Sequence, residues 1–247
     1  MPPSGPPNEQ EIMKIARRTT DIIESNITPH VCLFGSAASY LWAGIGRIPN
    51  VRCCHSLHLS IPLSTEQGGW SSQDVDIVVS GGFNPEDIKE EITQADDRYY
   101  LEPSRKPGAT HQILYCRLPG WTTDGRCVKV DILVPPTLNI PEISSSERDH
   151  IDYIPVMPIF DLLVMKTQGW WHHRNSPRAD QRDKEDDDVS DIVALLQSAK
   201  QENVSYADEA NEDRHSRKFM KYARTLANRF VRDKGRRRQW KALGFPV

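Results

Sequence analysis

The sequence predicts a mixed α/β fold, in which a β-sheet core flanked by helices is followed by a helical C-terminal part. In the first half of the chain, short apolar runs of strand length alternate with segments whose apolar residues recur at helical spacing. From Pro158 onward, the patterns are helical only. We therefore expect a disordered N-terminus at 1–8, a core at 9–140, a helical region at 141–233 and a basic tail at 234–247.

The chain begins with a segment that is too polar and too rich in proline to fold. Residues 1–8 include four prolines and one glycine. The next segment, 9–25, carries apolar and small residues at the spacing of a helix with one buried face. A short apolar strand is expected at 30–34. Ser36 then stands where the N-cap of a helix at 37–43 is expected.

The rest of the core is expected to consist of strands with one further helix. A Gly-Gly pair ends the strand that contains Val75, and Pro85 stands where the next helix opens. A Pro-Pro pair closes the last core strand. The expected strands span 75–79, 112–117 and 127–134, and the expected C-terminal helices span 159–170, 186–200 and 214–233.

The composition is that of a globular protein without a membrane-spanning or secretory segment. Hydrophobic residues make up 38% of the chain, and no apolar run reaches the roughly 20 residues needed to cross a bilayer. The five cysteines are an odd number, and three of them lie in apolar runs, which argues against a disulfide framework. We therefore expect a cytoplasmic or nuclear protein with no membrane partner.

The net charge of -3 conceals a strongly basic segment near the C-terminus. Residues 214–241 contain 12 of the 31 Lys and Arg residues, but only one of the 34 acidic residues. This segment is suited to contact with the backbone of an RNA, such as a tRNA. It also fits a nuclear localisation signal, or a solvated helix that balances an acidic body.

A pair of carboxylates on one expected strand suggests a site for a divalent cation. Strand alternation places the side chains of Asp74 and Asp76 on the same face. Two neighbouring carboxylates repel each other unless a cation lies between them, and hard oxygen ligands favour Mg²⁺ or Mn²⁺. Asp131 interrupts another apolar strand and shares its face with Lys129, so we expect Asp131 to be a further metal ligand or a general base. Taken alone, an Asp-x-Asp pair also occurs at exposed strand edges.

Gly35 and Ser36 stand where a phosphate-binding turn is expected. A glycine at a strand-to-helix turn lets an anion approach backbone N–H groups, and a helix N-terminus attracts negative charge. Taken alone, the same pair is also an ordinary helix cap. Beside a cluster of metal-binding carboxylates, it indicates a phosphoryl-transfer site.

Together these motifs resemble the signatures of the nucleotidyltransferase (polymerase-beta-like) superfamily. The similarity covers about residues 30–135. It is strongest to the toxin-type (AbiEii-like) and aminoglycoside nucleotidyltransferase groups and to fungal relatives of them. The matching runs are Phe34-Gly35-Ser36, Asp74-Val75-Asp76-Ile77 and Val130-Asp131-Ile132.

The resemblance implies a metal-dependent transfer of a nucleoside monophosphate from an NTP, ATP included, to a hydroxyl of RNA, a small molecule or a protein. It implies that Asp74, Asp76 and Asp131 are catalytic and bind Mg²⁺ or Mn²⁺, and that Gly35 and Ser36 bind the nucleotide. The alternative function is a catalytically inactive binding protein that keeps this fold.

The toxin-type group also carries a Lys in the helix after the core and an Arg/Lys-Asp pair in the following one. Lys166 and the run Arg182-Asp183-Lys184 match that outline. The resemblance therefore implies that Lys166 contacts a nucleotide phosphate. Its alternative interpretation is a solvated helix residue.

The interval between Gly35 and Asp74 is longer than the resemblance implies. Arg47 begins a run that resembles the lead-in which the family places directly before the first Asp, so Arg47 is expected to bind the nucleotide. Residues 51–73 separate this run from Asp74. Our hypothesis is that they are translated from a retained intron, and the alternative is a long surface loop.

Three further features have ordinary structural interpretations. The Cys and His residues of 53–58 lack a second ligand pair and are not expected to bind zinc. The aromatic and basic residues of 170–174 are expected to cover a helix end. The acidic run 186–188 is expected to open the following helix.

Overall fold

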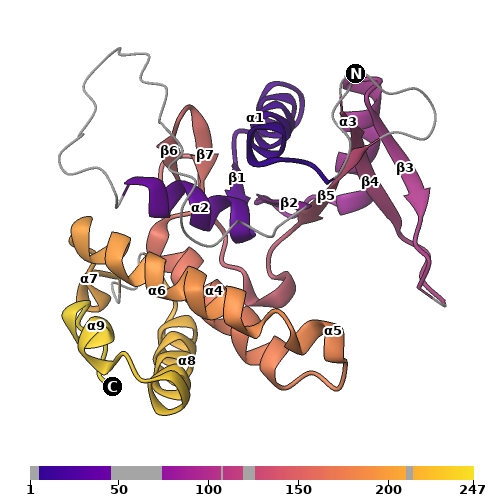
Figure 1. The fold of residues 1–247 in the computed structure, drawn as a ribbon. Helices are drawn as coiled ribbons and strands as arrows, with labels where there is room; N and C mark the ends of the chain where they lie inside the picture. The colour runs from indigo at the N-terminus through magenta and orange to yellow at the C-terminus, as the bar shows by residue number, and fades with distance from the viewer. Residues whose placement is uncertain (1–5, 46–73, 107, 119–125, 210–213) are drawn as a thin grey trace.

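The computed structural model describes residues 6–45, 74–106, 108–118, 126–209 and 214–247. Within these residues, a seven-stranded mixed sheet has the strand order β3-β4-β5-β2-β1-β7-β6 (Figure 1). β2 runs parallel to β5 and β1 parallel to β7, and the other neighbours are antiparallel. The strands are β1 (Val31–Phe34), β2 (Asp74–Val79), β3 (Tyr99–Pro103), β4 (Gln112–Arg117), β5 (Cys127–Leu133), β6 (Asp149–Ile151) and β7 (Ile154–Val156).

Helices cover the sheet from two sides. α1 (Glu9–Asn26) and α3 (Pro85–Ala95) pack against each other and against the strands on one side. α2 (Gly35–Ile45) packs against β1 and β2 from the other side, where a helical layer follows (Figure 1). That layer consists of α4 (Ile159–Arg174), α5 (Ala179–Arg182), α6 (Glu185–Gln201), α7 (Tyr206–Glu209), α8 (Arg217–Lys234) and α9 (Arg237–Ala242).

α1 forms because its apolar spacing is combined with a well-made N-terminus. Asn8 is the N-cap, and its side chain accepts a hydrogen bond from the backbone N–H of Glu11 while the Glu11 carboxylate accepts one from Asn8 N–H. Arg126, the residue directly before β5, forms an ion pair with Glu11 at 2.6 Å. The start of α1 is therefore held against the sheet by this ion pair.

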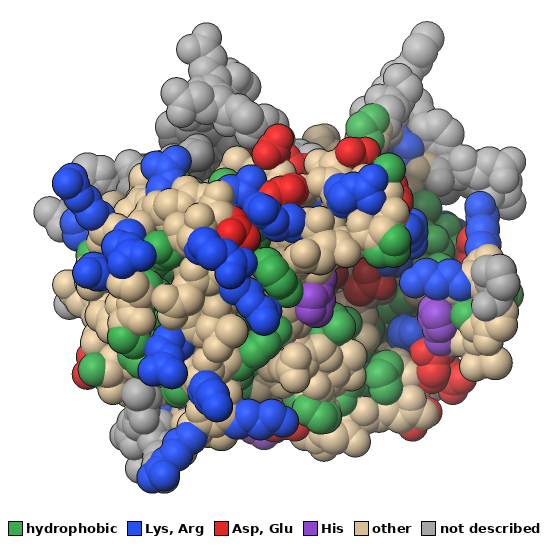
Figure 2. Space-filling model, turned by 90° about the horizontal axis from the view of Figure 1, so that it is seen from below, with side chains coloured by type: hydrophobic (Ala, Val, Ile, Leu, Met, Phe, Trp, Pro, Cys, Tyr) green, Lys and Arg blue, Asp and Glu red, His purple; other side chains and the backbone are tan. Residues whose placement is uncertain are grey.

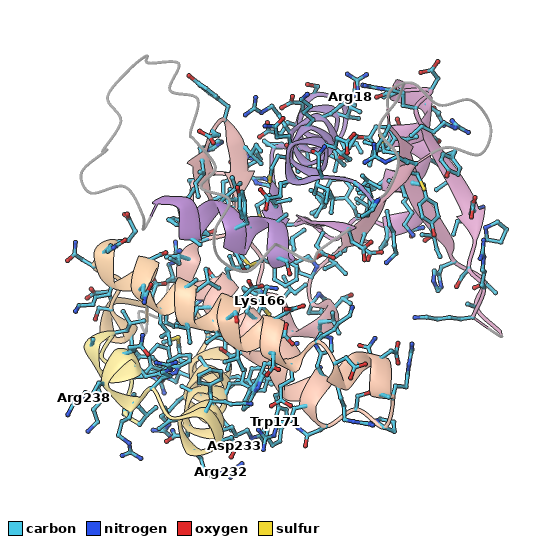
Figure 3. All side chains as sticks on the ribbon, viewed as in Figure 1. Arg18, Lys166, Trp171, Arg232, Asp233 and Arg238 are labelled. Atoms are coloured by element: carbon cyan, nitrogen blue, oxygen red, sulfur yellow. The ribbon has the colours of Figure 1, made fainter. Side chains whose placement is uncertain are left out.

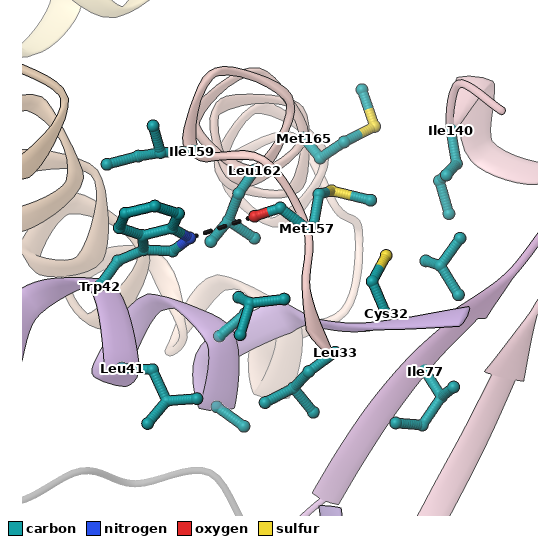
Figure 4. Close-up of a cluster of buried hydrophobic side chains, with 14 of the residues drawn as sticks. Cys32, Leu33, Leu41, Trp42, Ile77, Ile140, Met157, Ile159, Leu162 and Met165 are labelled. Carbon is teal, nitrogen blue, oxygen red and sulfur yellow. Dashed lines mark hydrogen bonds between the residues drawn. The ribbon is translucent and has the colours of Figure 1, made fainter. Parts of the chain in front are cut away.

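α4 is the central helix of the C-terminal layer. It packs against α2, α6 and α8, and its residues from Ile159 to Gln168 are all buried. α4 has no continuous polar face over these residues, which is typical of a helix that is surrounded by other elements. Trp42 of α2 joins this layer to the sheet, because its indole N–H donates to the carbonyl of Met157 at 3.1 Å (Figure 4).

The C-terminal end of the chain packs onto the helical layer through aromatic side chains. Trp240 is 1% exposed, and its ring meets Phe245 edge-on at 4.8 Å between centroids. Phe230 of α8 meets Trp170 of α4 in the same way at 4.9 Å. Edge-on pairs of this kind add to the stabilisation that burial provides. The expected basic tail at 234–247 is therefore anchored by its apolar residues.

The expected core strands and long helices are found, and the differences lie in short elements. The strands β3, β6 and β7 were not predicted, since β6 and β7 have three residues each and β3 carries Glu102 and Pro103. β7 pairs with β1, so the sheet continues beyond residue 140. α2 begins at Gly35, so Ser36 lies in its first turn instead of preceding it.

Among the described residues, no helix is both long and apolar enough to cross a membrane. Arg47 and the segment 51–73, including the Cys and His residues of 53–58, lie outside the described residues.

Candidate active site

Strand pairing brings the predicted acidic residues to one place. In the parallel pair of β2 and β5, Asp76 lies directly opposite Asp131. On the other side of β2, Asp76 is opposite Phe34, the last residue of β1. Because α2 starts immediately after Phe34, the start of this helix adjoins the carboxylates. The three motifs, which are far apart in the sequence, therefore meet on the three central strands of the sheet and at the start of α2.

Gly35 and Asp76 are in close contact. Gly35 has φ +68°, and a Cβ atom at this position would lie 2.0 Å from Asp76 Oδ2 and 2.9 Å from Asp76 Cγ. Both the left-handed backbone and the space taken by the carboxylate require glycine here. The carboxylate of Asp76 thus lies against the N-terminus of α2.

Lys129 lies among the three carboxylates. It is opposite Asp74 in the strand pairing, and its ammonium group forms an ion pair with Asp131. Lys129 and Asp131 are two positions apart on β5, so strand alternation places them on the same face, as predicted. In this arrangement the Asp131 carboxylate is neutralised by a protein cation.

Two carboxylates of this cluster have raised pKa values. Burial, and then the neighbouring Asp131, raise the pKa of Asp76 to about 6, although Lys166 acts in the opposite direction. Burial also raises the pKa of Asp74, against the opposing effects of Lys129 and Lys184. Raised carboxylate pKa values of this origin mark a place where an added cation is favoured.

A second cluster lies at the first turn of α2. Lys166, on the buried helix α4, donates to the hydroxyl of Ser36 at 2.7 Å, and it forms an ion pair with Asp191 of α6 at 2.7 Å. Lys166 is 8% exposed. Figure 3 places it between α2 and the helices of the C-terminal layer. Its alternative interpretation as a solvated helix residue is therefore wrong.

The donor set suits a hard divalent cation, but the described residues do not already form a closed metal site. Asp74, Asp76 and Asp131 supply carboxylate oxygens only, which is the ligand type that Mg²⁺ and Mn²⁺ prefer. No group of three His, Cys, Asp or Glu side chains in the described part of the chain is close enough to hold a metal ion as it stands. The ion pair between Lys129 and Asp131 gives a physical reason, because the lysine occupies that carboxylate.

The sheet face that bears the carboxylates continues into an aromatic surface. Tyr100 pairs with Tyr115, Tyr115 with Lys129, and Lys129 with Asp74. These four residues form a row across β3, β4, β5 and β2, which we call the tyrosine row. The two tyrosine rings stack with centroids 5.6 Å apart. Both rings are half-exposed. A flat π-surface therefore lies one residue away from the acidic cluster.

Figure 2 shows the surroundings of this face from below. Acidic side chains lie in a recess between the helical body and the projecting strands β3 and β4, whose positions are seen in Figure 1. The recess is open to solvent in this view. A ligand can therefore enter the recess from this side.

One carboxylate of this region was not singled out from the sequence, and another was given a different role. Asp191 is the carboxylate partner of Lys166, and its signal was its position one turn after Asp188 on the same helix. Asp188, which was assigned to the acidic helix start, is buried and contacts His173 Nδ1 at 2.6 Å. The tyrosine row was not found from the sequence, because β3 was not predicted and the alignment of Tyr100, Tyr115 and Lys129 depends on the register of the strand pairs.

Comparisons with known proteins support the fold. No family model matches the chain, and no curated protein matches its sequence. Among solved structures, the chain is similar to an antigenic nucleotidyltransferase-like protein from Paracoccidioides brasiliensis, with a TM-score of 0.61 and 16% identity over 98% of this chain and 96% of that chain. The predicted fold class is thereby confirmed: the chain has a mixed α/β, nucleotidyltransferase-like fold.

Proposed function

We propose that this protein is a metal-dependent nucleotidyltransferase that transfers a nucleoside monophosphate from an NTP to a hydroxyl group. The observation that carries the proposal is the contact between Gly35 and Asp76, with Asp131 alongside. It brings an anion-binding helix start and a cluster of cation-binding carboxylates together, and phosphoryl transfer requires both. The fold, which is shared with a nucleotidyltransferase-like protein, is consistent with this function.

Each group of the site has a role in the proposed reaction. Asp74 and Asp76 would hold Mg²⁺ or Mn²⁺, which offsets phosphate charge when it is bound. Backbone N–H groups at the start of α2, together with Ser36 and Lys166, bind the triphosphate. Asp131 either completes the metal site or accepts the proton of the acceptor hydroxyl. The acceptor oxygen forms a bond to the α-phosphorus, the bond to the bridging oxygen breaks, and pyrophosphate leaves.

Lys129 and the tyrosine row add two features to this proposal. Lys129 would have to release Asp131 for that carboxylate to hold a divalent cation, and the lysine ammonium group would then be available to a phosphate oxygen. Tyr115, next to Lys129 in the row, offers a ring face for the base of the nucleotide. Stacking on an aromatic ring stabilises any base, so this surface alone selects no particular NTP.

Lys166 pairs with a carboxylate of α6, and this acid is not the Asp of the run Arg182-Asp183-Lys184 that matches the toxin-type outline. In that group the resemblance implies a Lys in the helix after the core and an Arg/Lys-Asp pair in the next. Here Lys166 of α4 pairs with Asp191 of α6, while Asp183 lies just before α6. We therefore propose that Lys166, held by Asp191, is the phosphate contact of the site.

A second candidate is a non-catalytic binding protein with the same fold. The observation that favours it is the ion pair of Lys129 with Asp131, which replaces a metal ion by a protein cation. In that case, the site binds a nucleotide through α2 without transferring it.

The two candidates are separated by a labelling experiment. The protein is incubated with α-labelled NTPs, Mg²⁺ and total RNA or a set of small hydroxyl compounds. Asp76→Asn removes one charge and keeps the side-chain shape over Gly35, and Asp97→Asn is a matched control because Asp97 is exposed in a turn. The enzyme proposal expects label transfer that is lost in Asp76→Asn and kept in Asp97→Asn. Magnesium-independent NTP binding without transfer contradicts it and supports the binding protein.

A further inference from the structure

The outward face of α8 carries only basic and neutral side chains. Its hydrophobic face is buried against α4, and its apolar residues include Phe230 and Ala227. The exposed residues from 218 onward are Lys218, Lys221, Arg224, Thr225, Asn228 and Arg232. The helix of 18 residues is about 27 Å long, so this is an extended basic stripe.

An open hollow lies along this stripe. Its volume is about 570 Å³, and four arginines, one threonine and one asparagine line it: Arg224, Thr225, Asn228, Arg229, Arg232 and Arg237. Arg237 comes from α9, so the hollow is formed where the two helices meet. We call this surface the α8–α9 hollow.

In the described part of the chain, acidic side chains neutralise few of the arginines that line the α8–α9 hollow. Arg232 pairs with Asp233 at 2.8 Å, but Arg224 and Arg237 have no ion-pair partner among the described residues. The guanidinium of Arg229 lies over the ring of Trp171, 4.4 Å from its centroid. Like charges gathered in one hollow repel one another, and a bound anion offsets that repulsion. The size and length of the surface exceed what one phosphate group requires.

We propose that the α8–α9 hollow binds the sugar–phosphate backbone of an RNA chain. Arginines recognise phosphates through paired N–H donors. Thr225 and Asn228 each donate to a backbone carbonyl of α8 at 2.9 Å, which leaves their side-chain oxygens as acceptors. A phosphodiester has no proton to give to such an oxygen, whereas the ribose 2′-hydroxyl has one. This combination of donors and acceptors favours RNA over DNA.

The position of the hollow relates it to the proposed reaction. Figure 2 shows Lys and Arg side chains spread over the same face of the molecule on which the acidic recess opens. In Figure 3, Arg232 lies on α8 near Trp171 at the end of α4, the helix that also carries Lys166. An RNA lying across α8 can therefore present a terminal hydroxyl to the recess. This step rests on the proposed function and assigns RNA as its acceptor.

The test measures RNA binding by the full chain without NTP or divalent ions. The probe is a fluorescently labelled single-stranded RNA of mixed sequence, and the readout is anisotropy over a series of salt concentrations. The association constant is expected to fall with salt with a log–log slope of about -2 to -3, as for three or four phosphate contacts on a single strand. A DNA strand of the same sequence is expected to bind several-fold more weakly.

Charge reversals locate the binding surface. Arg224→Glu and Arg237→Glu are each expected to weaken RNA binding about tenfold, because a contact is lost and a repulsion is added. Glu is a good helix former at Arg224, and it suits the first turn of α9 at Arg237, so both variants should fold. Lys14→Glu is the matched control, since it changes the charge equally at an exposed position of α1 on the other side of the sheet.

The results separate this proposal from the proposed function. The proposal that RNA binds in the α8–α9 hollow is supported if both arginine variants bind RNA more weakly and Lys14→Glu binds it as the wild type does. Equal binding by all variants, equal binding of RNA and DNA, or binding of inorganic polyphosphate or anionic vesicles without RNA overturns it. If label transfer to a small acceptor persists while RNA does not bind, only the RNA assignment fails. If RNA binds while no label is transferred, the assignment of the α8–α9 hollow as an RNA-binding surface is retained and the proposed enzymatic function fails.

Discussion

Gly35 lies so close to Asp76 that a single added carbon on the glycine would overlap the carboxylate, at 2.0 Å from Oδ2. This contact joins the end of β1 to the middle of the acidic cluster on β2. It also holds the Asp76 carboxylate against the start of α2, where an anion-binding helix terminus and a cation-binding group adjoin. The contact is therefore a sensitive point for both stability and ligand binding.

Gly35→Ala is expected to destabilise the protein by about 2–3 kcal/mol, because alanine is strained at a positive φ and its Cβ displaces Asp76. Urea unfolding measures the loss of stability, and calorimetry measures the accompanying loss of NTP binding. Gly44→Ala is the control in the same helix, since a Cβ there meets nothing within 4 Å. That control should be neutral or stabilising by about 0.5–1 kcal/mol. Equal free energies of unfolding for Gly35→Ala and Gly44→Ala would contradict the close contact between Gly35 and Asp76.

Lys166→Met is expected to weaken NTP binding about tenfold, because Ser36 and the triphosphate lose a cation and Asp191 is left without its partner. Isothermal calorimetry with an NTP and Mg²⁺ measures the effect. Lys89→Met is the control: Lys89 has the same side-chain exposure, 9%, and pairs with Glu86 away from the site. Lys89→Met should lower stability without changing NTP affinity. A Lys166→Met protein that binds NTP normally removes Lys166 from the proposed site.

The stability of the fold is expected to depend on pH through Asp161. This residue of α4 is fully buried, and neither carboxylate oxygen has a hydrogen-bond partner among the described residues. Burial raises the pKa of Asp161 to about 7, although His215 and Arg214 act in the opposite direction. In the unfolded chain an Asp titrates near pH 4. Between about pH 4 and pH 7, the folded state therefore holds a proton that the unfolded state has released.

The sign of the effect follows from that difference in bound protons. The free energy of unfolding should fall as pH rises through this window, by about 2 kcal/mol between pH 5 and pH 8. Asp161→Asn, which cannot ionise, should remove this fall and stabilise the protein at pH 8, as measured by urea unfolding at each pH. Asp97→Asn, at an exposed position, should retain the wild-type profile. A profile unchanged by Asp161→Asn would show that other groups govern the dependence.

Tyr115→Ala is expected to raise the KM for the NTP about tenfold and to change kcat less, because a stacking surface beside Lys129 is lost while the carboxylates remain. Steady-state label transfer gives both constants, and fluorescence titration gives NTP affinity without turnover. Tyr115→Phe should keep the wild-type KM, since it retains the ring. Tyr153→Ala, at a tyrosine that is 84% exposed, is the control. A KM that is equal in Tyr115→Ala and wild type removes the ring from the nucleotide site.

The residue types of the candidate site were readable from local patterns. Alternation along a strand places Asp74 and Asp76 on one face whatever the strand pairs with, and a glycine between strand and helix marks a turn that a side chain would obstruct. The long helices were predictable for the same reason, because the spacing of their apolar residues is a property of the segment itself. What these patterns leave open is which neighbour each segment meets.

Tertiary structure alone decided the contacts between segments. The register of β2 on β5 places Asp76 beside Asp131, and the packing of α4 against α2 and α6 buries Lys166 between Ser36 and Asp191. The tyrosine row depends on the pairings of β3, β4 and β5 with their neighbours. A side chain's own segment determines the direction in which it points, whereas its partner is determined by how distant segments bury their apolar faces together. The sequence by itself thus determined the chemistry of the site, and the packing of the sheet and helices decided its geometry.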